Sequence, residues 1–206
     1  MKKYIILLIC FTLLLTGCTP KSEKTKKEEI KENPIVTMTI KDYGDITIEL
    51  YPNEVYNTVA NFVTLVEDGF YDNNEITRVQ KGFVVQAGGS KELDYTIKGE
   101  FSSNGVSNSI KHEEGVISMA RSSDPDSASG QFFIMLDTVS SLDGEYAAFG
   151  KVTEGMDIIH KIENTDFEYS DVDSMASMGF LKKGITIEKA TVDTKGYTYT
   201  VDKITN

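Results

Sequence analysis

Residues 78–89 of the chain read Arg-Val-Gln-Lys-Gly-Phe-Val-Val-Gln-Ala-Gly-Gly, and no other stretch is as informative about the fold. The stretch contains a short strand-like run, Gly82–Gln86, followed by a pair of glycines. Similar runs recur downstream, and the segments between them are rich in Gly, Ser, Asn and Asp, which is typical of loops. These later runs are Gly115–Ala120, Gln131–Leu136 and Tyr146–Val152, and then Ile185–Val192 and Tyr197–Val201, which we interpret as a closing hairpin around Lys195-Gly196.

Upstream of this stretch, apolar and polar residues alternate over residues 36–40 and again over 46–50, which predicts a β-hairpin. Apolar residues then follow helical spacing from Val55 to Val66, with Gly69 placed to end the helix. A second, shorter helix is predicted over residues 154–162. Many short strands with only two helices indicate a mainly β fold, a closed antiparallel barrel capped by the two α-helices.

The composition excludes several classes of function. The 206 residues are 40% apolar and 26% charged, which is enough apolar material for one sizeable core. A net charge of −11 repels phosphate backbones, so we expect no nucleic-acid partner. The only cysteines, Cys10 and Cys18, precede the body of the chain and exclude a disulfide scaffold or catalytic thiol there. The chain has no nucleophile elbow, phosphate-binding loop or zinc-protease motif, and we predict neither a metal nor a cofactor.

The first 17 residues have the pattern of a secretory signal peptide. A positive start, Met1-Lys2-Lys3, precedes an apolar run from Tyr4 to Leu15 that is too short to span a bilayer comfortably. The ending Leu15-Thr16-Gly17-Cys18 resembles the bacterial lipobox, in which the cysteine carries the lipid. We therefore predict a lipoprotein signal peptide over 1–17 and lipidation of Cys18. The alternative is an uncleaved anchor helix with a chance cysteine.

Residues 18–33 follow as the predicted lipidated cysteine and a charged, flexible tether, in which Ile30 is the only large apolar residue. The globular domain is then expected over residues 34–206. This organisation places the domain on the extracytoplasmic face of a membrane, attached through the lipid on Cys18, and we expect it to be a monomer.

Five further blocks accompany residues 78–89, in the order Thr58–Val63 (TVANFV), Gly69–Asp72 (GFYD), Gly115–Ala120 (GVISMA), Ser129–Ile134 (SGQFFI) and Leu142–Val152 (LDGEYAAFGKV). Together the six blocks resemble the cyclophilin-type peptidyl-prolyl isomerases over about residues 35–162. The resemblance implies an eight-stranded barrel with two capping helices and a proline-binding groove on one face.

The resemblance also assigns candidate site residues. Arg78 takes the position of the family's catalytic arginine, with Phe83 and Gln86 from the same block beside it. The lining of the hydrophobic proline pocket is expected to be Phe83, Val84, Met119, Phe133 and Leu142. The substrate backbone is expected to bind Gln86, Ala120, Arg121 and Gln131, with Tyr146 at the edge of the pocket.

Each of these residues also has a purely structural interpretation. Phe83, Met119 and Phe133 could be barrel core, and Arg78 could form a surface salt bridge. The ordered blocks favour the functional interpretation, because a guanidinium beside an apolar pocket can stabilise a twisted X–Pro amide without a nucleophile, metal or cofactor.

The sequence departs from the family pattern at several positions. Arg121 replaces a usual Asn, Tyr146 a frequent His, and Ser141 a Trp or His associated with strong cyclosporin binding, so we predict weak cyclosporin inhibition. Residues 163–184 have little family character, and we interpret them as a variable connection rather than a substrate-contacting loop.

Two functions remain open at this point. The first is a membrane-anchored prolyl isomerase that helps secreted or surface proteins fold. The alternative is a non-catalytic chaperone or adhesin-like module that holds Pro-containing segments. Retention of Arg78 favours catalysis, because a pure binding module has no need of that charge.

Overall fold

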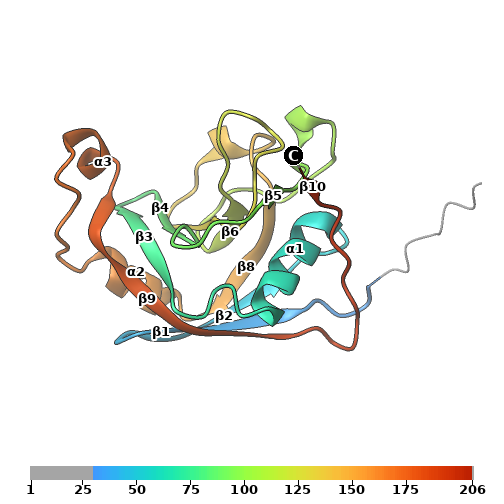
Figure 1. Ribbon diagram of the computed structural model, residues 1–206, viewed down its shortest axis with the longest axis horizontal. Helices are drawn as coiled ribbons and strands as arrows, with labels where there is room; N and C mark the ends of the chain where they lie inside the picture. The colour runs from blue at the N-terminus through green and yellow to red at the C-terminus, as the bar shows by residue number, and fades with distance from the viewer. Residues whose placement is uncertain (1–29, 206) are drawn as a thin grey trace, which may run out of the picture.

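Eight strands close the barrel in the computed structural model, which describes residues 30–205. Each pairs with its neighbours antiparallel, in the order β1-β2-β8-β6-β7-β4-β3-β9 (Figure 1). Their bounds are β1 Ile35–Ile40, β2 Gly44–Leu50, β3 Asn74–Gln80, β4 Val84–Ala87, β6 Val116–Met119, β7 Phe132–Met135, β8 Ala148–Glu154 and β9 Phe180–Asp193. The predicted fold class is therefore confirmed, including the hairpin of β1 and β2.

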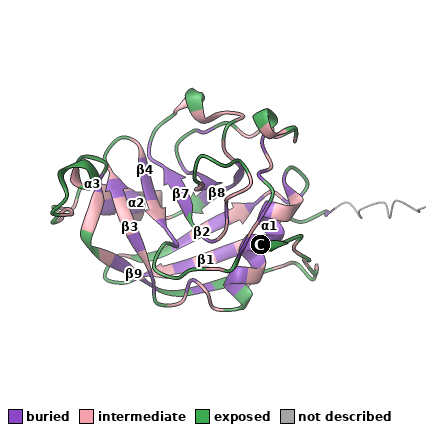
Figure 2. Ribbon diagram, turned by 45° about the horizontal axis from the view of Figure 1, so that its top comes forward, coloured by how far each residue is buried: buried purple, intermediate pink, exposed green. Residues whose placement is uncertain are grey.

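Two helices cap the barrel, as the periodicity predicts. Helix α1 (Tyr56–Glu67) buries most of one face, including Val59, Phe62 and Val66. The shorter α2 (Met156–Glu163) buries Ile159 and Ile162. The two helices lie at opposite ends of the barrel (Figures 1 and 2).

Three short helices and a small two-stranded sheet complete the described residues. They lie in the long connections and close to the C-terminus, outside the barrel ladder. These elements are η1 Ser102–Asn104, η2 Ser140–Leu142, α3 Asp173–Ser177, β5 Tyr95–Thr96 and β10 Ile204–Thr205.

The strands separate two groups of apolar side chains, because successive residues of a strand face opposite sides of the sheet. On β7, Phe132 and Ile134 belong to the main core inside the barrel. Their neighbours Phe133 and Met135 belong to a smaller cluster on the outer face. Its buried members are Val84, Val116, Phe133, Met135 and Ala148. This outer cluster, which we call the outer-face cluster, forms the base of the site described below.

The closing hairpin predicted around Lys195-Gly196 is wrong. Strand β9 is already paired with β1 on one side and with β3 on the other, so neither of its edges is free for residues 197–201. The chain instead turns after β9 and runs past α1, where Asn57 and Asp202 exchange two hydrogen bonds of 3.0 and 2.7 Å. Its end, β10, pairs with β5.

Ile30, which we placed in the flexible tether, is buried. Its side chain is only 7% exposed, and its backbone exchanges hydrogen bonds of 3.2 and 2.7 Å with the Asn53 side chain. Packing is therefore already present four residues before the expected start at residue 34. The predicted signal peptide and Cys18 lie outside the described residues, and within residues 30–205 no helix is long and apolar enough to cross a bilayer.

Candidate active site

A β-bulge in β3 places Arg78 on the outer face of the barrel. Ile76 pairs with Ala87, whereas Arg78, two residues later, pairs with the adjacent Gln86, so β3 has one extra residue at this point. Ile76 and Val79 on either side are both buried in the main core. A bulge redirects side chains in this way, and here it turns Arg78 away from the core.

Three acceptors hold the Arg78 guanidinium. Its Nε donates to the Met178 carbonyl at 2.7 Å, Nη1 donates to Gln86 Oε1 at 3.2 Å, and Nη2 donates to Gln80 Oε1. Because a guanidinium has five N–H donors in a rigid fork, two of them are left without a partner among residues 30–205. The group is thus fixed in place and still able to donate to a ligand.

Two aromatic rings flank the same guanidinium. The ring centroids of Phe83 and Phe180 each lie 5.6 Å from Arg78 Cζ, within the range of a cation–π contact. Burial lowers the pKa of Arg78 below its ordinary value. A guanidinium remains protonated at neutral pH even so, and it therefore acts as a fixed, partly desolvated positive charge.

A cavity of about 380 Å³ opens beside Arg78. It contains all the predicted site residues except Met119 and Gln131, and one residue that the sequence analysis did not single out, Phe180. The lining residues are Arg78, Phe83, Val84, Gln86, Ala120, Arg121, Phe133, Leu142, Tyr146 and Phe180. Residues separated by up to 102 positions in the sequence therefore meet at a single apolar pocket with two guanidinium groups at its wall.

Phe133, a member of the outer-face cluster, packs against two other rings at the wall of this pocket. The Tyr146 ring meets Phe133 edge-to-face, with centroids 5.8 Å apart and planes at 80°. On its other side, Phe133 stacks against the His112 ring at 6.2 Å. Aromatic contacts of this kind restrict the rotamers of both rings, so the pocket is preformed.

His112 in turn is fixed from both ring nitrogens. Nδ1 lies 3.1 Å from Asp143 Oδ1, and Nε2 lies 3.1 Å from Ser118 Oγ. Burial lowers the pKa of His112 from 6.5 despite the opposing effect of the Asp143 carboxylate, so the neutral ring is favoured. Asp143 also follows Leu142 in the chain, and this buried network therefore ties the pocket wall to the barrel.

A second cavity of about 340 Å³ adjoins the first and shares Gln86, Ala120 and Arg121 with it. The predicted residue Gln131 lies here, and Gln86 Nε2 donates to its Oε1 at 3.0 Å. The Arg121 guanidinium lies 4.6 Å from the Tyr146 ring centroid. This second cavity is polar, as expected for a region that binds a peptide backbone.

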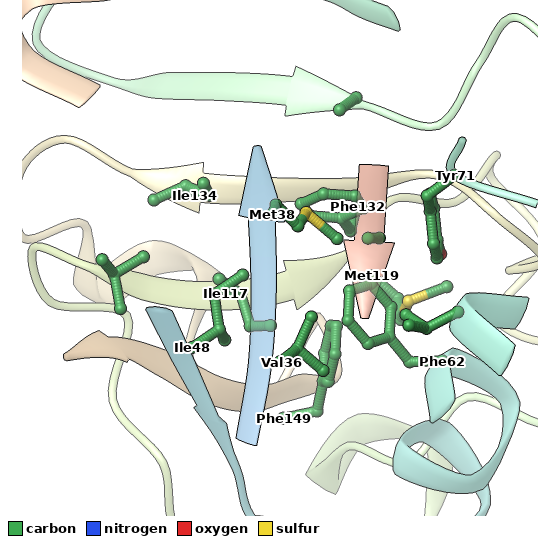
Figure 3. Packing of buried hydrophobic residues seen from close by; sticks show 14 of the residues in the cluster. Val36, Met38, Ile48, Phe62, Tyr71, Ile117, Met119, Phe132, Ile134 and Phe149 are labelled. Atoms are coloured by element: carbon green, nitrogen blue, oxygen red, sulfur yellow. The ribbon is translucent and has the colours of Figure 1, made fainter. Parts of the chain in front are cut away.

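Met119 does not line either cavity, and its predicted place in the proline pocket is wrong. Its side chain is 1% exposed and packs in the barrel core with Phe132 and Ile117 (Figure 3). The reason is the alternation along β6, which turns Ser118 outward toward His112 and Met119 inward.

Phe180 and the Met178 carbonyl are the site features that the sequence analysis missed. Both lie in the segment that we interpreted as a variable connection, and both contact Arg78. They reach it because β9 begins at Phe180, which pairs directly with Arg78 of β3. The adjacent apolar residues Phe180 and Leu181 were the available signal of a buried contact. No local pattern, however, indicates a partner a hundred residues away in the sequence.

Within the described residues, no three His, Cys, Asp or Glu side chains are grouped so that they could hold a metal ion. The features of the site that could act on a ligand are the guanidinium donors, the apolar pocket and the polar second cavity.

Comparison with known proteins identifies the family. Residues 35–192 match the family model described as cyclophilin-type peptidyl-prolyl cis-trans isomerase. A peptidyl-prolyl cis-trans isomerase of Helicobacter pylori strain J99 is 35% identical over 153 residues, covering 71% of this chain and 91% of the relative. One from Arabidopsis thaliana is 40% identical over 134 residues, covering 59% of this chain and 57% of that longer relative.

Among solved structures, a Cryptosporidium parvum cyclophilin-type isomerase determined in the presence of the dipeptide Ala-Pro superposes with a TM-score of 0.64. The match has 25% sequence identity and covers 77% of this chain and 98% of that one. With its barrel, its guanidinium-flanked pocket and a family match over residues 35–192, the chain belongs to the cyclophilin-type peptidyl-prolyl cis-trans isomerases.

Proposed function

We propose that this isomerase is anchored to a membrane through a lipid on Cys18 and assists the folding of secreted or surface proteins on the extracytoplasmic side. The isomerase chemistry is carried by one observation, the Arg78 guanidinium held by three protein acceptors beside an apolar pocket with two donors left over. The location rests on the signal-peptide and lipobox pattern of residues 1–18.

The reaction requires the X–Pro amide to lose its double-bond character. Resonance opposes this rotation by about 18–20 kcal/mol. At the twisted geometry the prolyl nitrogen regains a lone pair and becomes a hydrogen-bond acceptor. A free N–H of Arg78 can donate to that nitrogen only in the twisted state, and it therefore lowers the barrier without binding the planar amide equally well.

The apolar pocket acts on the proline ring. Phe83, Phe133 and Leu142 offer apolar surface to the ring, and the stacked support under Phe133 keeps that surface rigid. A ring immobilised in this way lets the residue before proline rotate against a fixed partner, and it excludes water from the amide.

The polar second cavity acts on the substrate backbone. Gln86, Gln131 and the backbone at Ala120 offer donors and acceptors next to the pocket. The similar Cryptosporidium isomerase, whose structure was determined in the presence of Ala-Pro, supports a site for a proline-containing peptide here as well.

The function is tested by adding the full chain to a protein whose refolding is limited by X–Pro isomerisation. The slow phase, tens to hundreds of seconds without catalyst, accelerates in proportion to the amount of chain added. If the slow phase keeps its rate while the chain binds the unfolded protein, the non-catalytic chaperone or adhesin-like function is correct instead.

The anchor is tested separately by incorporation of labelled fatty acid. Label is expected in the full chain and not in Cys18→Ala, which should also leave the membrane fraction. Label retained in Cys18→Ala would refute the lipidation site, with no bearing on the isomerase chemistry.

A further inference from the structure

We propose that the segment 166–180, which we call the α3 arm, extends the substrate site and selects client segments that carry large apolar side chains near the proline. This inference rests on the proposed isomerase function and names the substrate class of the same site. The evidence for it is the set of contacts that the arm makes with the strand carrying Arg78 and with the pocket.

The arm is a hairpin that continues the barrel beyond its rim. Ser170 N donates to the Phe180 carbonyl at 2.8 Å, and Lys182 N donates to the Glu168 carbonyl at 2.8 Å. The five-residue helix α3 lies between the two sides of the hairpin. Figure 1 shows α3 beyond the Phe180 end of β9, at the edge of the fold.

The base of the arm is fastened to the strand that carries Arg78. Val79 N donates to the Gly179 carbonyl at 2.8 Å, and Arg78 Nε donates to the Met178 carbonyl at 2.7 Å. Gly179 has a φ of +85°, and a Cβ there would lie 2.4 Å from the Val79 carbonyl oxygen, so only glycine permits this close approach. The arm is therefore held in a defined position against the catalytic face.

The arm also supplies part of the pocket itself. Phe180 lines the same 380 Å³ cavity as Phe133 and Leu142, on the side where it flanks the Arg78 guanidinium. A peptide seated in the pocket can therefore contact Phe180, and we expect the residues next to its proline to reach the arm.

The arm offers such a peptide three exposed apolar side chains, alongside exposed carboxylates such as those of Asp171 and Asp173. Val172, Met175 and Met178 are 54%, 39% and 46% exposed, and they are three of the four exposed large hydrophobic residues in the described chain. Met175 lies within α3, and Val172 and Met178 flank the two ends of this helix at a spacing of three residues. Figure 2 shows the arm as one of the most exposed segments of the fold. Unbranched methionine side chains adapt to different apolar partners, which suits a site that must accept many clients.

The experiment compares two peptides that share Ala-Pro at the centre, one with two leucines and one with two serines on each side. For the full wild-type chain, exchange measured by NMR gives a kcat/KM about tenfold higher for the leucine-flanked peptide, from partial burial of leucine on the arm. In the double variant Val172→Ser, Met175→Ser, this preference falls to about twofold, because KM rises for the leucine-flanked peptide. Both residues are exposed, so the fold is retained.

Ile204→Ser serves as the matched control, because Ile204 is 40% exposed but lies on β10 and away from the arm. Its preference stays at the wild-type value. Methyl labelling of methionine adds a readout that needs no catalysis. The Met175 methyl signal shifts with the leucine-flanked peptide, whereas the core residue Met119 serves as the unperturbed reference.

Equal rates for both peptides, unchanged in the double variant, would overturn the role of the arm and leave the isomerase function intact. Shifts of Met175 without acceleration of either peptide would support client binding by the arm and refute the isomerase function. A Met175 signal that moves with protein concentration and not with peptide would assign the arm to self-association, which also overturns the proposal.

Discussion

Gln86 links Arg78, the proposed catalytic residue, to the polar second cavity, and Gln86→Leu tests what that link contributes. Gln86 Oε1 accepts from Arg78 Nη1 at 3.2 Å, while its Nε2 donates to Gln131 at 3.0 Å. Leucine has a similar volume and removes both hydrogen bonds. The guanidinium is then held by two acceptors, the Met178 carbonyl and Gln80 Oε1.

The size of the effect follows from the kind of hydrogen bond that is lost. A hydrogen bond to a charged group contributes about 1.5–3 kcal/mol, and the half-exposed site with its 3.2 Å separation favours the lower value. We therefore expect kcat to fall about tenfold. Gln131→Leu is the matched control, since it removes only the neutral Gln–Gln bond, and its expected loss is about threefold.

The assay is catalysed exchange of a proline peptide at saturating concentration, followed by NMR, with urea unfolding measured alongside. Unfolding free energies of both variants should stay within about 1 kcal/mol of wild type, because neither side chain is in the core. If Gln131→Leu loses as much kcat as Gln86→Leu, or Gln86→Leu loses none, the orientation of Arg78 by Gln86 is wrong.

Three further predictions concern stability and inhibition. Burial lowers the pKa of His112 below 6.5, so the stability contributed by its neutral ring is present above pH 6.5 and is lost as the pH falls below that value. In a plot of the urea midpoint against pH, His112→Gln is expected to flatten this part of the curve. Gly179→Ala is expected to lower the unfolding free energy by more than about 1 kcal/mol. The loss should exceed that of Gly82→Ala, because φ is positive at both glycines but the space around Gly82 is open. Equal urea midpoints for the two variants would contradict the close approach of Gly179 to β3. Cyclosporin inhibits weakly, because exposed Ser141 offers neither an indole ring nor its donor, and a nanomolar inhibition constant in the exchange assay would refute this.

Local patterns were sufficient for the elements whose neighbours in space are also neighbours in sequence. The alternation over 36–40 and 46–50 predicts the β1–β2 hairpin, and the apolar spacing from Val55 to Val66 predicts α1. The family resemblance named nine of the ten residues that line the 380 Å³ cavity, all except Phe180, and the structure brings these nine together.

The errors arose where distant segments determine the structure. The bulge at Arg78 breaks the alternation of β3, so no strand was predicted over 74–80. The hairpin at 195–196 was wrong because both edges of β9 are occupied by strands from the first half of the barrel. Met119 was placed in the pocket from the family resemblance of its block, whereas the alternation along β6 turns its side chain into the core. Met178 and Phe180 were missed because their contact with Arg78 has no local signature.

The central claim is that Arg78 acts on the transition state, and the most direct test is kcat at saturating peptide for wild type, Arg78→Lys and Arg78→Ala. The account predicts that Arg78→Ala loses about 100-fold or more in kcat with little change in KM, because its free donors meet the prolyl nitrogen only when the amide is twisted. Arg78→Lys should recover only part of the loss, since a lysine lacks the rigid fork held by Met178, Gln86 and Gln80. An unchanged kcat with a raised KM in Arg78→Ala would contradict the account, because the arginine would then only bind the substrate.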